Sequence, residues 1–247
     1  MIGSIHAEWV KFRSVRANVI LIAIAVGAPI VLSVLLSALT PFGGLVGGEE
    51  VFSTTVIAPC MVAVYLCGVL GVLGIGQEYR HNTIRVTFAA QPRRSIVLAA
   101  KTMVYGLFGL VVGLVTTGVC LVLAASILQA RSRPFTTVWA DVFGQLIFFV
   151  LVTWFAFGLG SIMRQPAGAI PVFLLWPLLI EGIAGLILDS AVDGYSKWLP
   201  FRAGQRLALS QGDLSNFLPR AAAGAYFAMW TVAMTALGWS MVKRRDA

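Results

Sequence analysis

Six apolar stretches, each long enough to cross a bilayer as a helix, constrain this chain more than any other feature. We predict spans at about residues 17–40, 51–76, 102–128, 138–163, 167–188 and 220–242. A helix needs about 20 consecutive apolar residues to cross the hydrocarbon, at a rise of about 1.5 Å per residue. The sequence therefore predicts an all-α membrane protein in which residues 1–247 form a single domain of six transmembrane helices.

The composition supports the same fold class. Of the 247 residues, 59% are hydrophobic and only 11% are charged, and the mean hydropathy is +0.89. A water-soluble globule needs more charge on its surface. The net charge of +8 is accounted for by basic residues beside the spans, so we expect contact with the lipid bilayer and no nucleic-acid partner.

Residues 1–16 have the pattern of an amphipathic helix at the membrane surface, leading into the first span. Apolar residues fall on one helical face and charged residues around the rest. The apolar residues are Ile2, Ile5, Trp9 and Phe12, and the charged ones are Glu8, Lys11, Arg13 and Arg16. A secretory signal is the alternative, but the apolar run from Ala17 to about Thr40 is longer than a signal peptide requires.

A polar segment from Gln77 to Lys101 carries the densest positive charge between any two spans. Its only acid is Glu78, and its apolar residues recur at loosely helical spacing. The bases are Arg80, Arg85, Arg93, Arg94 and Lys101, and the apolar residues are Tyr79, Ile84, Phe88, Ile96 and Leu98. We predict one or two short amphipathic helices, broken at Pro92 and lying at the membrane surface.

The distribution of charge predicts the orientation. With a cytoplasmic N-terminus, most of the 18 Lys and Arg residues fall on the cytoplasmic side. The first external loop carries Glu49 and Glu50, whereas Arg131 and Arg133 run against the rule. Both termini are therefore predicted to be cytoplasmic.

Glycines in the second and third spans predict close helix packing. Gly68, Gly71, Gly74 and Gly76 lie near the end of the second span, and Gly109 and Gly113 form a G-x-x-x-G pair in the third. We favour packing within the fold over a dimer seam, because G-x-x-x-G is a weak motif. The three cysteines, Cys60, Cys67 and Cys120, lie inside apolar runs and are expected to pack as small hydrophobes, with no metal site.

Glu181 is an acid inside the fifth span. It lies about 10 Å into the hydrocarbon, where a carboxylate costs about 2–3 kcal/mol unless it is paired, hydrated or protonated. Pro171 and Pro177 precede it and favour a kinked helix. Two interpretations of Glu181 stay open: it belongs to the cargo path or gate, or it makes a structural hydrogen bond to a neighbouring helix. Arg202 and Arg206 are candidate partners of its carboxylate.

The segment 189–219 is too polar to cross the membrane and too apolar for a solvated linker. Aromatic and aliphatic residues such as Trp198, Leu199 and Phe201 are spread through it. We predict one or two short external helices that dip into the outer leaflet and cap the spans beside Glu181. An ordered loop on the outer surface is the alternative.

Several short motifs, taken in order, resemble those of a bacterial ABC-2 type transporter permease, the membrane subunit of an ABC exporter. The first is E-W-x-K-x-R-S before the first span, and the second is E-Y-R-x-x-T-I-R after the second span. Pro92-Arg93-Arg94 follows, and Lys101 opens the third span. The first two comprise Glu8, Trp9, Lys11, Arg13 and Ser14, then Glu78, Tyr79, Arg80, Thr83, Ile84 and Arg85.

The resemblance implies a coupling helix from Glu78 to Arg94 that docks a separate ABC ATPase subunit, and an interfacial helix over residues 2–15. It also implies a second permease subunit, in a homodimer or heterodimer, in the bacterial cell membrane. The cargo class it suggests is a drug or antibiotic, a peptide or a lipid-like molecule. The chain has no G-x-x-x-x-G-K-[ST] motif, so we expect it to be no enzyme and to bind no cofactor, with ATP and Mg²⁺ in the partner ATPase.

Two other functions stay open. A secondary transporter is expected to carry several ionisable groups inside its spans, and Glu181 is the only clear one. A membrane anchor or assembly protein without transport activity is the other. An intramembrane enzyme is disfavoured, because the spans carry no ligand cluster such as H-E-x-x-H.

Overall fold

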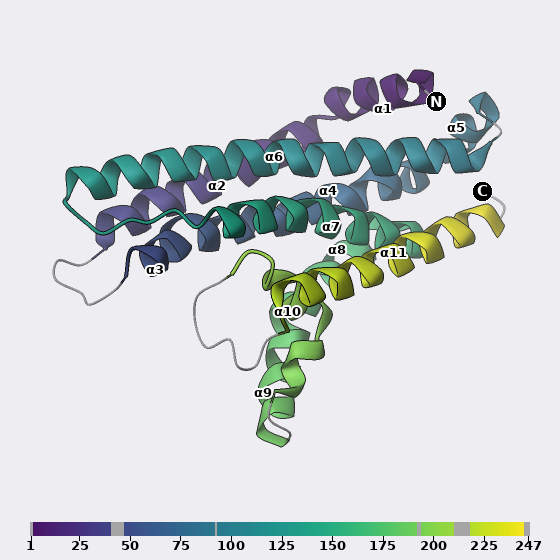
Figure 1. Cartoon of the computed structure of the whole chain (residues 1–247). Helices are drawn as coiled ribbons and strands as arrows, with labels where there is room; N and C mark the ends of the chain where they lie inside the picture. Colours follow the sequence, from purple (N-terminus) through teal and green to yellow (C-terminus); the bar gives the residue numbers. More distant parts are fainter. Residues whose placement is uncertain (1, 41–46, 92, 192–193, 210–217, 245–247) are drawn as a thin grey trace.

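The computed structural model describes residues 2–40, 47–91, 93–191, 194–209 and 218–244, and every regular element within these ranges is helical (Figure 1). Six helical segments are long and apolar enough to cross a membrane, which confirms the predicted spans of a multi-pass integral membrane protein. They are α2 (Arg16–Leu39), α3 to α4 (Gly48–Arg80), α6 (Arg94–Ala130), α7 (Trp139–Met163), α8 to α9 (Pro166–Ser190) and α11 (Arg220–Arg244).

The remaining elements are short. Helix α1 (Ile2–Ser14) precedes the first span, α5 (Ile84–Ala90) lies between the second and third, and η3 (Tyr195–Trp198) and α10 (Pro200–Gln205) precede the last. Within the second segment, α3 (Gly48–Phe52) continues through the π-helical turn η1 (Ser53–Ile57) into α4 (Ala58–Arg80). The predicted N-terminal helix and the short helices before the last span are thus present.

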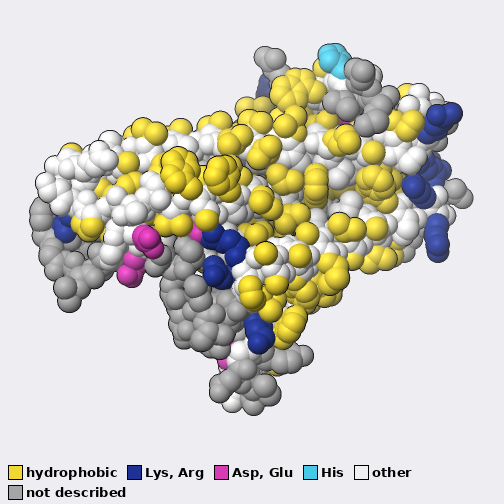
Figure 2. Space-filling view, viewed as in Figure 1, with side chains coloured by type: hydrophobic (Ala, Val, Ile, Leu, Met, Phe, Trp, Pro, Cys, Tyr) yellow, Lys and Arg dark blue, Asp and Glu magenta, His cyan; other side chains and the backbone are white. Residues whose placement is uncertain are grey.

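The two chain termini lie at the same end of the bundle, together with α5 (Figure 1). We call this the terminal end, and the opposite end, which carries α3, the far end. Figure 2 shows Lys and Arg side chains gathered at the terminal end and hydrophobic side chains along the flank. An even number of spans places both termini on the same side of the membrane.

Helices α4 and α7 form the centre of the bundle and pack extensively against each other. Glycines permit their close approach: a Cβ atom on Gly160 would lie only 2.8 Å from the carbonyl oxygen of Val72. On α6, Gly109 and Gly113 face Thr153 and Phe149 of α7. The G-x-x-x-G pair therefore serves helix packing within this chain, as predicted.

Of the one or two short helices predicted around Pro92, the described residues form one, α5. Helix α6 begins at Arg94 and runs without interruption to Ala130, so the polar residues up to Lys101 form the first turns of the third span. Val97 and Leu98 are buried there and continue the apolar periodicity of the span backwards. Pro92 itself lies outside the described residues.

The fifth span is helical throughout but irregular in the region where its prolines predict a kink. Helix α8 (Pro166–Leu175) ends in a π-helical turn, η2 (Trp176–Ile180), which contains Pro177, and α9 (Glu181–Ala191) follows. Figure 1 shows α9 pointing away from the direction of the other long helices. Glu181 is the first residue after the turn, and the turn thus determines where this carboxylate lies.

Arg131 and Arg133, the two arginines that run against the charge rule, close the end of α2. The Arg131 guanidinium donates to the carbonyl oxygen of Ala38, and Arg133 donates to that of Thr40 at 3.3 Å. The last carbonyl groups of a helix have no partner within it, so these contacts satisfy groups that would otherwise be open.

Candidate functional site

A buried ionic network lies near the terminal end and joins three helices. The side chain of Lys101, in α6, is fully buried, and its Nζ donates to Glu8 Oε2 of α1 at 2.6 Å and to Glu78 Oε1 of α4 at 2.7 Å. Lys11 of α1 also donates to Glu78 Oε1. The two lysines and two glutamates balance in charge, and we call them the ionic network.

The ionic network changes the roles expected of its members. Glu78 was predicted in the docking segment, but it is only 3% exposed and faces Lys101 and Lys11. Lys101, near the start of α6, is a second buried ionisable group in addition to Glu181, and the expectation that Glu181 is the only clear one inside the spans stays a prediction. Reasoning from sequence missed the pairing, although two lone acids, Glu8 and Glu78, among basic residues were its signal.

Helix α1 is held against α6 by rings as well as by charge. Phe12 stacks on Phe108 with ring centroids 3.6 Å apart, and Trp9 stacks on the same ring at 5.1 Å. Trp9 is still 47% exposed, so one face of α1 is open to its surroundings. The side chain of Arg13, the remaining residue predicted on this interfacial helix, lies outside the described part of the chain.

Helix α5 is amphipathic, and its apolar face points inward. The chain leaves α4 through a turn in which Asn82 has a positive φ of 54°. Ile84 and Phe88 are buried in a cluster with Phe12 and Val97. On the other face Arg85 is exposed and Val86 is 70% exposed. The helix is thus anchored to the bundle and exposes one charged and one large apolar side chain, Arg85 and Val86.

The residues predicted to couple to an ATPase divide into two groups. Arg80, Thr83, Arg85 and Arg93 are exposed, whereas Glu78, Tyr79, Ile84 and Arg94 are buried or half-buried. The Arg164 guanidinium lies 4.9 Å from the centre of the Tyr79 ring. Arg94 donates to the carbonyl oxygens of Val242 and Lys243, both at 3.2 Å. The first group is available to a partner, and the second holds the segment in place.

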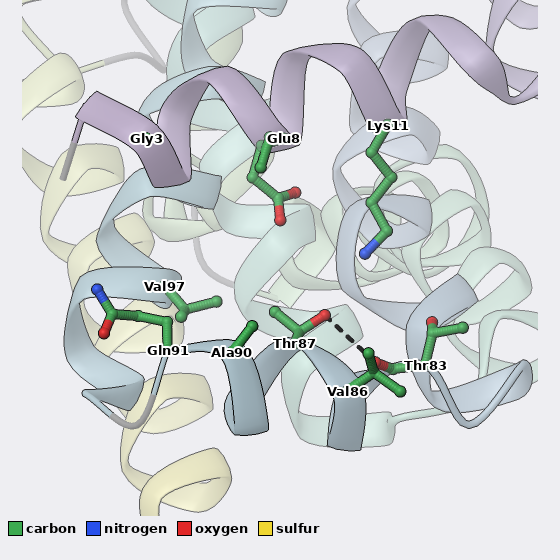
Figure 3. A pocket seen from close by; sticks show the side chains of 10 residues that line it. Gly3, Glu8, Lys11, Thr83, Val86, Thr87, Ala90, Gln91 and Val97 are labelled. Atoms are coloured by element: carbon green, nitrogen blue, oxygen red, sulfur yellow. Dashed lines mark hydrogen bonds between the residues drawn. The ribbon is translucent and has the colours of Figure 1, made fainter.

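A groove of about 670 Å³ runs between α1 and α5 (Figure 3). In this view Glu8 and Lys11 extend from α1 toward α5, and the Thr87 hydroxyl donates to the Thr83 carbonyl oxygen at 3.2 Å. We call it the α1–α5 groove. Its lining residues are Gly3, Ala7, Glu8, Lys11, Thr83, Val86, Thr87, Ala90, Gln91 and Val97.

Glu181 is hydrogen-bonded by the segment that follows the fifth span. Its carboxylate is buried and accepts the backbone N–H groups of Phe201 at 3.0 Å and Arg202 at 2.9 Å, and the indole N–H of Trp176 at 3.0 Å. The two backbone groups belong to the first turn of α10, where N–H groups lack partners within the helix. The Arg202 side chain instead lies 3.7 Å from Asp189. The structural hydrogen bond is therefore present, and a role in gating stays a prediction.

Helix α10 is inserted into the bundle by an aromatic side chain. Phe201 is 1% exposed, with ring centroids 5.1 Å from Phe155, 5.2 Å from Phe227 and 6.1 Å from Phe173. One turn later the Gln205 amide donates to the Tyr65 hydroxyl at 2.8 Å. We call α10 with these contacts the far-end cap.

A further ion pair lies beside the far-end cap. Asp141, near the start of α7, is fully buried and is paired with Arg220 at the start of α11. Reasoning from sequence passed over Asp141, because an acid in the first turn of a helix is ordinary. Its pairing joins the beginnings of α7 and α11, two helices that pack against the far-end cap.

Comparison with models of known protein families found no match, and comparison with curated proteins found none either.

Proposed function

We propose that this protein is the permease subunit of an ATP-binding cassette exporter and that α5 docks a separate ATPase subunit. The observation that carries the proposal is the construction of α5. It stands at the terminal end, exposes Arg85 and Val86, and is anchored by Ile84 and Phe88. In this arrangement the terminal end is cytoplasmic, in keeping with its Lys and Arg side chains.

The ionic network supports the proposal because it can transmit a movement of the docked segment. Glu78 lies six residues before α5, and it is bonded to Lys101 of α6 and Lys11 of α1. Pulling one partner away would leave an unpaired buried charge, which costs about 3–5 kcal/mol. A displacement of α5 therefore moves α1, α4 and α6 together instead of bending one loop.

The far-end cap is the corresponding element on the external side. Phe201 closes the aromatic core, and Glu181 links the cap to the irregular fifth span. Release of cargo requires this cap to move, and breaking the Glu181 hydrogen bonds is one way to free it. The cargo class we propose is a drug or antibiotic, a peptide or a lipid-like molecule, carried between this chain and a second permease subunit.

The experiment that tests the proposal is purification of this protein from its native membranes, followed by reconstitution with the ABC ATPase that copurifies. We expect the two full-length chains to copurify and ATP hydrolysis to be required for transport in liposomes. Hydrolysis by the ATPase that is unaffected by the permease, together with cargo movement without ATP, would contradict the proposal.

A secondary transporter is the second candidate, and specific observations favour it. Lys101, near the start of α6, and Asp141, near the start of α7, are fully buried ionisable groups in addition to Glu181. Such groups are typical of ion-coupled pathways. The same liposomes separate the two functions: a protonophore abolishes transport driven by a proton gradient and leaves ATP-driven transport intact.

A further inference from the structure

We propose that the α1–α5 groove binds one anionic phospholipid of the cytoplasmic leaflet. The acyl chain lies along the apolar wall of the groove, and the phosphate group lies at the end formed by Lys11. The binding of a lipid does not require that α5 docks an ATPase, although Val86 of the exposed α5 surface also lines the groove.

The walls of the groove suit a hydrocarbon chain. Ala7 of α1 and Ala90 of α5 face the same space with Val86, and Val97 of α6 also lines it (Figure 3). These side chains are small or aliphatic and do not fill the space between α1 and α5, which therefore stays open. Covering such a surface with an acyl chain removes apolar area from water, at about 25 cal/mol per Å².

The polar end of the groove suits a phosphodiester. Lys11 lies there; its ammonium group bonds Glu78, and 40% of its side chain is exposed. Figure 3 shows Gln91 at the opposite end of the groove, beside Val97, so it takes no part at this end. Glu8 also lines the groove, but Lys101 balances its charge.

The surroundings are positive overall. The ionic network is neutral, and Arg80 and Arg85, which do not line the groove but are exposed on the same stretch of chain, add two positive charges at this end of the bundle. An anionic leaflet attracts such residues by about 1 kcal/mol for each Lys or Arg near its surface. A zwitterionic lipid gains no such attraction, so charge selects an anionic headgroup.

The depth of the groove matches a leaflet surface. Helix α1 ends directly before the first span, and the third span begins at Arg94, four residues after α5. Trp9 is 47% exposed and Val10 is 52% exposed on α1. Exposed Trp is typical of the headgroup level of a membrane. A lipid can therefore move sideways from the leaflet into the groove while it stays at the same depth in the membrane.

The test measures lipid bound to the full-length protein by native mass spectrometry in detergent, with added phosphatidylglycerol or phosphatidylcholine. We expect the wild-type protein to retain one phosphatidylglycerol, and Ala90→Phe, which fills the groove, to lose it. Ala89→Phe is the matched control, because Ala89 is an exposed neighbour on α5 that does not line the groove. Ala7→Phe fills the groove from the opposite wall and provides a second, independent variant.

Three results would overturn the inference. Retention of phosphatidylglycerol by both groove-filling variants would place the lipid elsewhere. Equal retention of phosphatidylcholine would remove the role of the anionic headgroup. Unchanged lipid retention with loss of the partner ATPase in Ala90→Phe would show that the groove receives a protein segment instead of a lipid.

Discussion

Lys101 and Glu78 join the third span to the second at the terminal end of the bundle, with Lys101 Nζ 2.7 Å from Glu78 Oε1. Both side chains are buried, at 0% and 4% exposure. Glu78 lies in the last turn of α4, and α5, on which Arg85 and Val86 are exposed, follows it. The pair thus lies directly behind the surface that we propose as the docking site.

Removing Lys101 should destabilise the protein more than removing Lys11. Lys101→Met leaves Glu8 and Glu78 without their shared buried partner, so we expect a loss of about 3–5 kcal/mol in the free energy of unfolding. Lys11→Met is the control, because Lys11 is 40% exposed and shares Glu78 with Lys101. Thermal unfolding in detergent measures both. Equal melting temperatures for Lys101→Met and wild type would contradict a stabilising network.

Reversing charge on the exposed face of the docking segment should uncouple ATP hydrolysis from transport. Arg80 and Arg85 are exposed, so the double variant Arg80→Glu/Arg85→Glu is expected to fold and insert normally. Arg16→Glu, at an exposed position at the start of α2, controls for changed charge at the same end. ATPase activity and transport are measured in the same liposomes. Normal transport by the double variant would refute docking through these arginines.

The two ends of the bundle should be accessible from opposite sides of the membrane. In intact cells a membrane-impermeant maleimide is expected to label Glu49→Cys and to spare Ser95→Cys. Both positions are exposed in the structure, so burial does not explain a difference between them. Cys60, Cys67 and Cys120 are buried and give a low background. Labelling of Ser95→Cys from outside would invert the orientation and remove α5 from the cytoplasm.

Substitutions at Glu181 should separate its hydrogen bonds from its charge. Glu181→Leu leaves three N–H donors without an acceptor, and each costs about 1–3 kcal/mol when it is buried and unsatisfied. Glu181→Gln keeps one oxygen for Trp176 and Phe201 but turns an amide toward the N–H of Arg202, so we expect a smaller loss. Thermal unfolding and transport are compared. If Glu181→Gln transports normally while Glu181→Leu is unstable, the residue is structural and the gate is not at Glu181.

Truncating the aromatic side chain of the far-end cap should loosen this end of the bundle. Phe201→Ala opens a cavity among Phe155, Phe173 and Phe227, and the expected cost is about 3–5 kcal/mol. Trp198→Ala removes a larger ring that is 47% exposed, so it should cost less. Hydrogen exchange of residues 200–209 reports the opening. Equal protection in Phe201→Ala and wild type would show that Phe201 does not hold the cap.

The sequence alone determined the features that depend on local composition and period. The six spans, the amphipathic α1 and α5, and the irregular turn before Glu181 follow from apolar run length, helical spacing and proline, each of which acts within a few residues. Charge counting also predicts the orientation, which stays a prediction. The position of an acid inside an apolar run also identified Glu181 as a residue that needs a partner, but it did not identify the partner.

Only the tertiary structure decided which of these elements meet. Lys101 reaches Glu8 across 93 positions in the chain, and Glu181 accepts backbone donors 20 and 21 positions away. Such pairings depend on how helices distant in sequence cross and on which glycines let them approach, so no local pattern contains them. Burial then separated the predicted docking residues: Glu78 turned inward because a buried lysine on α6 required a carboxylate, while Arg80 and Arg85 remained at the surface because nothing buried required them.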